Sequence, residues 1–313
     1  MDPSERVAQR VKLRALHVLE AVVRSGSMAK AASQLNVTQP AVSKAIGELE
    51  RTLGVRLLER NPQGVEPTVY GRALLKRGMA IFDEIKLGVK EIQFLADPTA
   101  GEIRIGCGEA FGAGLLPAIL ERLGRLYPRI SYHVVLTTSP EEELQVLRER
   151  RVDMLLTRVS EPFLEEDMHA DVLFHERLYV IAGKQSKWAR RRSVSLCELI
   201  NEQWILTPPN SVPFSLMEEA FRAKNLAVPA ARAVSFSLHL RNSLLPTGRY
   251  LTVLPGSCLR YSAMRSAFKA LPVEFPSRPT PVAIVTLTHR TPNPVTQILV
   301  DCARDVAKPL RGK

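Results

Sequence analysis

Polar side chains gather at the start of one expected helix in the first quarter of the chain, where they could contact the edges of DNA bases. Gln39, Ser43 and Lys44 fall on the side of this segment that lies opposite its apolar residues. A glutamine can form two hydrogen bonds with adenine, a serine can contact several bases, and a lysine can reach guanine or a phosphate. Pro40 offers an apolar edge to a thymine methyl group. These residue types at this spacing indicate recognition of a DNA sequence.

Two short helices joined by a tight turn are expected to position these side chains. Met28 to Leu35 should form the first helix, with Ser27 as its N-cap. Asn36 suits the turn because asparagine tolerates the left-handed backbone conformation. Thr38 and Pro40 suit the start of the second helix, whose apolar stripe consists of Val42, Ile46, Leu49 and Leu53. This layout is typical of a helix-turn-helix, although an ordinary helical hairpin with a polar face would share it.

Further DNA contacts are expected around these two helices. Ser33 and Thr38 are placed to contact phosphates, although capping of the helix alone would also explain Thr38. Residues 56–60 and 65–67, joined by a turn, predict a two-stranded wing. Arg60 lies on this wing, where it could enter the minor groove or hold the DNA backbone.

The segment from Leu13 to Leu75 resembles the N-terminal region of the LysR-type transcriptional regulators. The resemblance is ordered and nearly gapless, and it rests on Leu13, Gly26-Ser27, Ala31-Ala32, Leu35, the run from Thr38 to Ser43, Leu49-Glu50, Leu53-Gly54, Leu58, Arg60, Thr68 and Gly71. Leu58 departs from the Phe that the family often has there. The resemblance implies a sequence-specific regulator that binds double-stranded promoter DNA as a homodimer or homotetramer and acts together with RNA polymerase.

A single long helix is expected from Thr68 to Ala96. Its apolar residues recur in a heptad pattern, with one line at Leu74, Ile81, Gly88 and Leu95 and a second at Gly78, Ile85 and Ile92. A lone helix cannot bury such a stripe against a small winged domain, so we expect it to pair with a second copy of the chain. Packing on the C-terminal half of the same chain is the alternative. In the LysR-type regulators the equivalent segment is the dimerising linker helix.

The composition fits a DNA-binding protein with two or three domains. The 313 residues carry a formal net charge of +11, which suits a polyanionic partner, and the ten polar residues at the start are expected to be frayed. The four scattered cysteines argue against a zinc site or a disulfide framework and favour a cytoplasmic location. We find no signal peptide and no apolar run that could span a membrane. The sequence offers no catalytic constellation, metal ligands or cofactor motif, so we expect a protein that is not an enzyme.

Short apolar strands alternate with helices after the long helix, which predicts a parallel α/β sheet beyond a hinge at residues 97–101. The chain as a whole is therefore expected to be α/β with an α-rich N-terminal domain. The family resemblance implies that the C-terminal part is a periplasmic-binding-protein-like domain of two subdomains. The expected domains are the winged helix-turn-helix (1–67), the linker helix (68–96) and the effector-binding domain (97–313), with subdomain one at 101–172 and 279–313 and subdomain two at 173–278.

Polar residues that follow the expected strands are candidates for an effector site, because ligands of open α/β sheets bind at the carboxyl ends of the strands. The first strand ends near Cys107, Gly108 and Glu109, at the start of a helix whose free amides favour a polar or anionic group. Four further candidates follow other strands: Thr157, Thr207, Asn210 and Ser211. A turn or helix cap would explain each of these four equally well.

The sequence also bears on the class of effector. Regulators of the LysR type usually bind a small metabolite between the two subdomains, often a carboxylate. A carboxylate at Glu109 would repel an anionic effector if it faced the cleft, so we expect a sugar or another polyol, with sugar acids and aromatic acids as alternatives. The run from Val65 to Gly101 is similar to the branch of the family that controls sugar uptake or aromatic-acid catabolism.

Two other functions remain open at the level of sequence. Cys107 lies between glycines at a helix start, where the helix dipole lowers the pKa of a thiol, so the protein could be a redox-sensing regulator. A buried and unreactive cysteine is the simpler interpretation. The second alternative is an enzyme built on the binding-protein fold.

Overall fold

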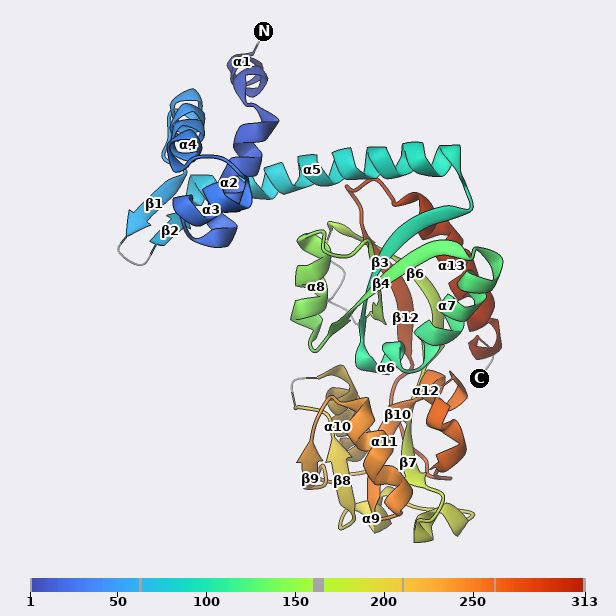
Figure 1. Ribbon diagram of the computed structural model, residues 1–313. Helices are drawn as coiled ribbons and strands as arrows, with labels where there is room; N and C mark the ends of the chain where they lie inside the picture. The colour runs from blue at the N-terminus through green and yellow to red at the C-terminus, as the bar shows by residue number, and fades with distance from the viewer. Residues whose placement is uncertain (1, 62–63, 160–165, 210, 262, 312–313) are drawn as a thin grey trace. The chain divides into compact units, whose positions relative to one another are not determined.

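The chain forms two compact units, Met1–Lys86 and Leu87–Lys313, in a computed structural model that describes residues 2–61, 64–159, 166–209, 211–261 and 263–311. The long helix α5 (Val69–Ala96) belongs to both units (Figure 1). The division between the units therefore falls inside this helix, before the boundary expected at residue 97.

Four helices form most of the first unit: α1 (Pro3–Arg10), α2 (Leu13–Ser25), α3 (Met28–Gln34) and α4 (Gln39–Leu53). The prediction that the first ten residues are frayed is wrong, because α1 occupies most of them. Pro3 at the start, Glu5 in the first turn and Arg10 in the last turn all favour a helix and its dipole. The remaining helices pack around a core that includes Leu19, Val22, Ala31, Val42 and Ile46.

A two-stranded wing follows α4, formed by the antiparallel strands β1 (Leu58–Asn61) and β2 (Gly64–Pro67). Glu50 of α4 fixes its start, because Glu50 Oε1 accepts a hydrogen bond from the Leu57 amide at 2.8 Å. Thr68 closes the other end, where its hydroxyl accepts from the Gly71 amide at 3.0 Å. A Cβ atom at Gly71 would lie 2.1 Å from the Leu57 carbonyl oxygen, so only glycine fits there. These contacts explain several residues of the family resemblance.

Helix α5 is 28 residues long and carries an apolar stripe that stays exposed in the single chain. The stripe is formed by the exposed side chains of Ile81, Ile85, Val89, Ile92 and Leu95. Its position agrees with the heptad pattern in the sequence.

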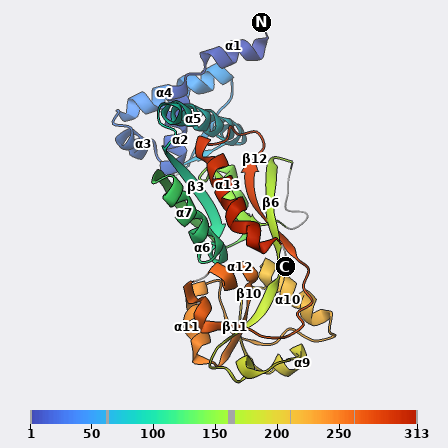
Figure 2. The same ribbon diagram turned by 90° about the vertical axis from the view of Figure 1, so that its right-hand side faces the viewer.

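The first subdomain of the second unit contains five strands: β3 (Ala100–Gly108), β4 (Arg129–Thr137), β5 (Met154–Arg158), β6 (Met168–Glu176) and β12 (Thr280–Leu287). Their order in the sheet is β4-β3-β5-β12-β6. Helices α7 (Leu115–Leu126) and α13 (Pro294–Ala307) lie side by side and share one core with the sheet (Figure 2). Helix α8 (Pro140–Arg148) packs on β3, β4, β5 and β12.

The second subdomain contains a sheet of five strands in the order β11-β7-β10-β8-β9. Its strands are β7 (Leu178–Gly183), β8 (Gln203–Leu206), β9 (Ala231–Val234), β10 (Tyr250–Pro255) and β11 (Phe268–Ala270). Its helices include α9 (Leu196–Leu199), α10 (Val212–Arg222), α11 (Leu238–Leu244) and α12 (Gly256–Tyr261). Trp204 and Phe221 are fully buried at its centre.

The sheets are mixed, so the prediction of a parallel sheet is wrong in this respect. Strand β12 runs antiparallel to both β5 and β6, and β10 runs antiparallel to β7. The reason is that β6 leads the chain out of the first sheet and β12 brings it back beside β6. Strand β6 stays in the first sheet as far as Glu176, so the crossing lies at Arg177 and not at the expected residue 173. Strand β3 begins at Ala100, inside the expected hinge.

Candidate functional site

The helices α3 and α4 display most of the residues that the sequence predicts to contact DNA. Their side chains are exposed at Ser33, Thr38, Gln39, Pro40 and Lys44 and half-buried at Ser43. The side chain of Arg60 lies outside the part of the chain that the structure describes.

Local hydrogen bonds position the start of α4 as the sequence predicts. The Thr38 hydroxyl accepts a hydrogen bond from the Ala41 amide at 3.4 Å, and Asn36 in the turn has a φ of 52°, in the left-handed region. Val42 and Ile46 are buried on the face of α4 that packs in the core. The opposite, polar face at the start of α4 is therefore available to a partner, as in a helix-turn-helix.

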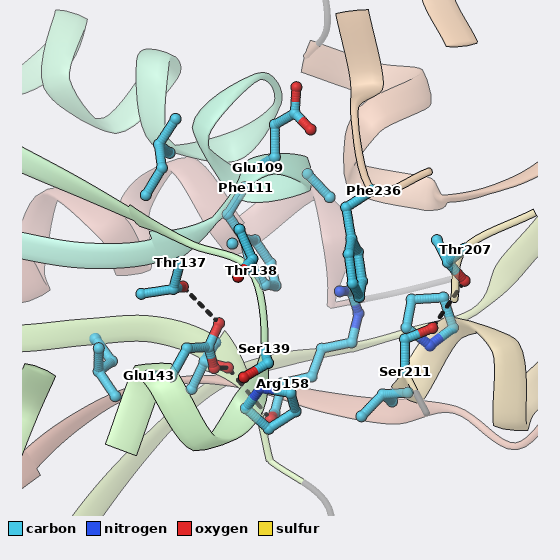
Figure 3. Close-up of a pocket in the computed structure, with 18 of the residues that line it drawn as sticks. Glu109, Phe111, Thr137, Thr138, Ser139, Glu143, Arg158, Thr207, Ser211 and Phe236 are labelled. Carbon is cyan, nitrogen blue, oxygen red and sulfur yellow. Dashed lines mark hydrogen bonds between the residues drawn. The ribbon is translucent and has the colours of Figure 1, made fainter. Parts of the chain in front are cut away.

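A second candidate site is a cavity of about 300 Å³ in the cleft between the two subdomains of the second unit (Figure 3). This volume lies at the lower end of the range of small-molecule sites, roughly 300–1,000 Å³. Five of the predicted effector residues line it: Gly108, Glu109, Thr157, Thr207 and Ser211. Cys107 does not line it, and Asn210 lies outside the described residues.

The carboxylate of Glu109 is turned to the second subdomain. Glu109 Oε2 accepts a hydrogen bond from the Leu238 amide at 2.7 Å, and Oε1 accepts one from the His239 amide at 3.4 Å. Both amides belong to the first turn of α11, whose free N–H groups favour a negative charge. In Figure 3 this carboxylate points away from Thr137 and Glu143. The sequence-based argument for a polyol loses its basis, because it required the Glu109 carboxylate to face the bound ligand.

Cys107 lies in the hydrophobic core, with 0% of its surface exposed. Burial, together with the nearby Glu143, raises the pKa of the Cys107 thiol to about 12. A thiol with such a pKa is almost entirely protonated at neutral pH and is a poor nucleophile. The physical argument for redox sensing by Cys107 therefore fails.

Two arginines in the cavity were not predicted from the sequence. Arg158, at the end of β5, forms an ion pair with Glu176 at 2.7 Å, and its guanidinium lies 4.6 Å from the centroid of the Phe111 ring. Arg241, on α11, is 5% exposed, and its Nη2 donates to the Phe236 carbonyl at 2.9 Å. Arg158 follows the predicted Thr157 directly, so the strand end could have indicated it. No feature of the sequence distinguishes Arg241 from other helix arginines.

Glu143 of α8 was also missed, because it stands in an acidic run that looks solvated. It lines the cavity, where it accepts hydrogen bonds from the hydroxyls of Thr157 and Thr137. Burial raises the pKa of the Glu143 carboxyl, and the two hydroxyls oppose this effect only in part. Thr207 and Ser211 line the opposite wall, with their hydroxyl oxygens 2.8 Å apart.

This arrangement of an exposed helix-turn-helix and a two-subdomain domain with a central cavity defines a ligand-responsive DNA-binding protein. Residues 13–72 match the family described as "Bacterial regulatory helix-turn-helix protein, lysR family". Residues 96–308 match the family described as "LysR substrate binding domain". The chain belongs to the LysR family of DNA-binding transcriptional regulators, whose members combine these two domains, form oligomers and are not enzymes.

Individual relatives agree with this assignment. The chain is similar to the HTH-type transcriptional regulator YdcI of Escherichia coli K12, with 24% identity over 97% of this chain and 98% of the relative. It is 28% identical to TdcA of the same organism, over 84% of this chain and 83% of TdcA.

Solved structures share the fold of the chain. Full-length CbnR in complex with its target DNA superimposes with a TM-score of 0.67 at 20% identity, over 95% of this chain and all of CbnR. A full-length OxyR variant from Pseudomonas aeruginosa has a TM-score of 0.66 at 20% identity, over 95% of each chain.

None of the helices that the structure describes has both the length and the apolar composition needed to span a bilayer.

Proposed function

We propose that the effector of this LysR-type regulator is a small aromatic acid, or a similar carboxylate with an apolar body, bound beside Arg241 and Arg158. The strongest support for this proposal is that the side chain of Arg241 is buried without a carboxylate partner among the described residues. Its guanidinium is buried, its Nε has no hydrogen-bond acceptor, and no carboxylate of the described residues forms an ion pair with it. A buried charge is costly unless it is paired, so an anionic ligand would stabilise this site.

Arg158 supports the same class of ligand. Its guanidinium is mostly buried, and among the described residues its Nε also has no acceptor, while its Nη2 donates to Glu176. The stacking of this guanidinium on Phe111 fixes its position in the cavity wall. A ligand carboxylate that enters between the two arginines would meet two preorganised cations.

The remaining walls favour an apolar body over a sugar. Apolar side chains line most of the cavity, among them Leu136, Leu144, Leu155, Met168, Phe236 and Val285. The hydroxyls of Thr137 and Thr157 bind Glu143, and those of Thr207 and Ser211 bind each other. These paired groups among the described residues are less available to the hydroxyls of a polyol, which would lose hydrogen bonds to water on entry. Of the two branches suggested by the sequence, this cavity supports the one that controls aromatic-acid catabolism.

At the promoter, we assign base recognition to the exposed start of α4, through Gln39, Pro40, Ser43 and Lys44. Ser33 and Thr38 would contact phosphates, and Arg60 would contact the DNA from the wing. Two copies of the chain would pair through the exposed stripe of α5, either as a dimer or within a tetramer. RNA polymerase is the expected partner of the resulting promoter complex.

Calorimetry with the full-length protein tests the effector class. We expect aromatic acids to bind, their neutral amides to bind more weakly, and sugars not to bind. Arg241→Gln should weaken the binding of the acids by about tenfold or more and leave the amides nearly unchanged, because only the acids lose a charge-assisted hydrogen bond. Arg222→Gln is the matched control, since Arg222 is exposed on α10 and pairs with Glu218. Sugars that bind more tightly than the acids would contradict the proposal.

A further inference from the structure

The positive charge of the protein is concentrated in its second subdomain. Residues 178–278 contain fourteen Lys and Arg but five Asp and Glu, which gives them a formal net charge of +9 out of +11 for the whole chain. The DNA-binding helices therefore do not account for most of the basicity of the protein. Runs of basic residues are often simply exposed to solvent. A binding site additionally requires that the cations lie close together on one surface and lack carboxylate partners.

Six exposed cations lie around one turn of this subdomain and define what we call the basic face: Lys184, Lys187, Arg190, Arg191, Arg192 and Arg249. Most of them belong to the 3-10 helix η1 (Lys187–Arg190) and its flanks. Arg249 adjoins them, since a Cβ atom at the preceding Gly248 would lie 3.0 Å from the Gln185 carbonyl carbon. Both views show this stretch, which leads into α9, at the end of the second sheet that is far from the first sheet (Figures 1 and 2).

The turn that carries the basic face is held in place by buried contacts. The Ser186 hydroxyl accepts a hydrogen bond from the Trp188 amide, and the Trp188 ring packs in the core of the subdomain. Lys187 Nζ lies 5.1 Å and the Arg191 guanidinium 5.9 Å from the centroid of this ring. From the neighbouring strand β11, Lys269 donates to the Ala189 carbonyl. The cations are thus presented from a fixed backbone.

Carboxylates neutralise only part of the basic face. Lys187 pairs with Glu202 at 2.8 Å and Arg191 with Glu198 at 3.1 Å. Among the described residues, no carboxylate forms an ion pair with the other four cations: Lys184, Arg190, Arg192 and Arg249. Three exposed arginines of the first subdomain differ in this respect, because each has a carboxylate partner: Arg122, Arg125 and Arg129.

We propose that the basic face binds the phosphate backbone of duplex DNA that flanks the operator, as a second DNA contact beside the helix-turn-helix. The exposed residues between Lys184 and Ser193 are cations and small polar residues, without an exposed apolar side chain. A protein interface usually has an apolar core, whereas phosphate contacts need only charge and hydrogen-bond donors. The protein binds duplex DNA through its helix-turn-helix, so the phosphates of the DNA that flanks the operator are a polyanion present in the same complex.

Binding of the full-length protein to two duplexes tests this proposal. A short duplex covers only the recognition site, and a long duplex extends it on both sides with unrelated sequence. We expect the wild type to bind the long duplex more tightly. The triple variant Arg190→Gln, Arg191→Gln and Arg192→Gln should bind the short duplex like the wild type but lose roughly tenfold on the long one at low salt. Its salt dependence on the long duplex should fall by about 0.9 in log–log slope for each phosphate contact removed.

A control variant separates a local contact from the loss of overall charge. Arg122→Gln, Arg125→Gln and Arg129→Gln remove the same charge from the first subdomain, and we expect this variant to bind both duplexes like the wild type. Unchanged binding of the short duplex by the test variant shows that its fold is intact. The proposal would be overturned if the test variant bound the long duplex with wild-type affinity, or if both variants lost affinity equally. The first of these results would indicate that the basic face binds an acidic protein and not DNA.

Discussion

Glu109 and Leu238 connect the two subdomains across the effector cleft, with Glu109 Oε2 2.7 Å from the Leu238 amide nitrogen. The carboxylate comes from the first residue of the short helix α6 (Glu109–Gly112), directly after β3, and the amide belongs to the start of α11 in the other subdomain. A side chain of the protein therefore occupies the free amides that an anionic ligand could otherwise take. These hydrogen bonds join the two sides of the cleft.

The first prediction concerns the charge on this bridge. Glu109→Gln keeps one acceptor oxygen but removes the negative charge, so we expect the second unit to lose about 1 kcal/mol of stability, the difference between a charge-assisted and a neutral hydrogen bond. Urea unfolding followed by tryptophan fluorescence measures this loss, since both tryptophans, Trp188 and Trp204, lie in the second subdomain. As a control, Glu121→Gln removes an exposed ion pair with Arg125 and should change little. Equal unfolding midpoints for Glu109→Gln and the wild type would show that the bridge does not hold the cleft.

Local signals in the sequence predict the DNA-binding unit well. The caps at Ser27 and Thr38, the left-handed turn at Asn36 and the stripe at Val42 and Ile46 each depend on neighbouring residues only. The alternation of apolar strands and helices in the second unit is predicted as well. The antiparallel directions of β12 and β10 are not predicted, because the alternation of strands and helices indicates a parallel sheet. Strand direction depends on how the chain crosses between the sheets, which no local pattern encodes.

The effector cavity was predicted only in part, for the same reason. Strand ends indicated Gly108, Thr157 and Thr207, because sheet topology brings such ends to one edge. The orientation of Glu109 depends on α11, more than a hundred residues later in the chain. The burial of Arg241 likewise depends on its distant neighbours. The chemistry of the cleft therefore follows from tertiary contacts more than from any motif.

A second prediction concerns base recognition by α4. Gln39 is exposed at the start of this helix, so Gln39→Ala should cost about 1 to 3 kcal/mol of binding free energy at the preferred operator and little on random DNA. Gel-shift titrations on both duplexes at one salt concentration measure the difference. Thr38→Ser is a suitable control, because it keeps the hydroxyl that accepts from the Ala41 amide. Equal losses on operator and random DNA would assign Gln39 to the backbone instead.

The third prediction concerns pairing of two copies of the chain through the apolar stripe of α5. Ile85 is 47% exposed in the single chain, and Ile85→Asp would place a carboxylate in the expected helix pair. Burial of an unpaired charge costs several kcal/mol, so we expect loss of the dimer and of operator binding. Sedimentation velocity and gel shift report the two effects. As a control, Gln93→Asp places a carboxylate on α5 outside the stripe, and this variant should form the wild-type oligomer. If Ile85→Asp also formed the wild-type oligomer, the stripe would not be the pairing surface.

The last prediction uses two neighbouring carboxyls of α8 whose pKa values move in opposite directions. Burial raises the pKa of Glu143 above the ordinary 4.5, so its ionised form is disfavoured in the folded state. The contribution of Glu143 to the stability of the wild type therefore falls as the pH rises from 4.5 through the raised pKa. Glu143→Gln stays neutral and does not suffer this loss. It should gain stability relative to the wild type at neutral pH, and the gain should disappear below pH 4.5.

Glu142 supplies the matched control, because hydrogen bonds from the Thr138 amide and hydroxyl lower the pKa of its carboxyl. This contribution is present above the ordinary pKa of 4.5 and is lost as the pH falls through the lowered pKa. Glu142→Gln should therefore be less stable than the wild type at neutral pH and approach it in acid, the opposite of Glu143→Gln. Urea unfolding of the three proteins across this pH range tests both signs. Parallel pH profiles for the two variants would mean that Glu143 is hydrated in solution, because a solvated carboxyl in the cavity carries no burial penalty.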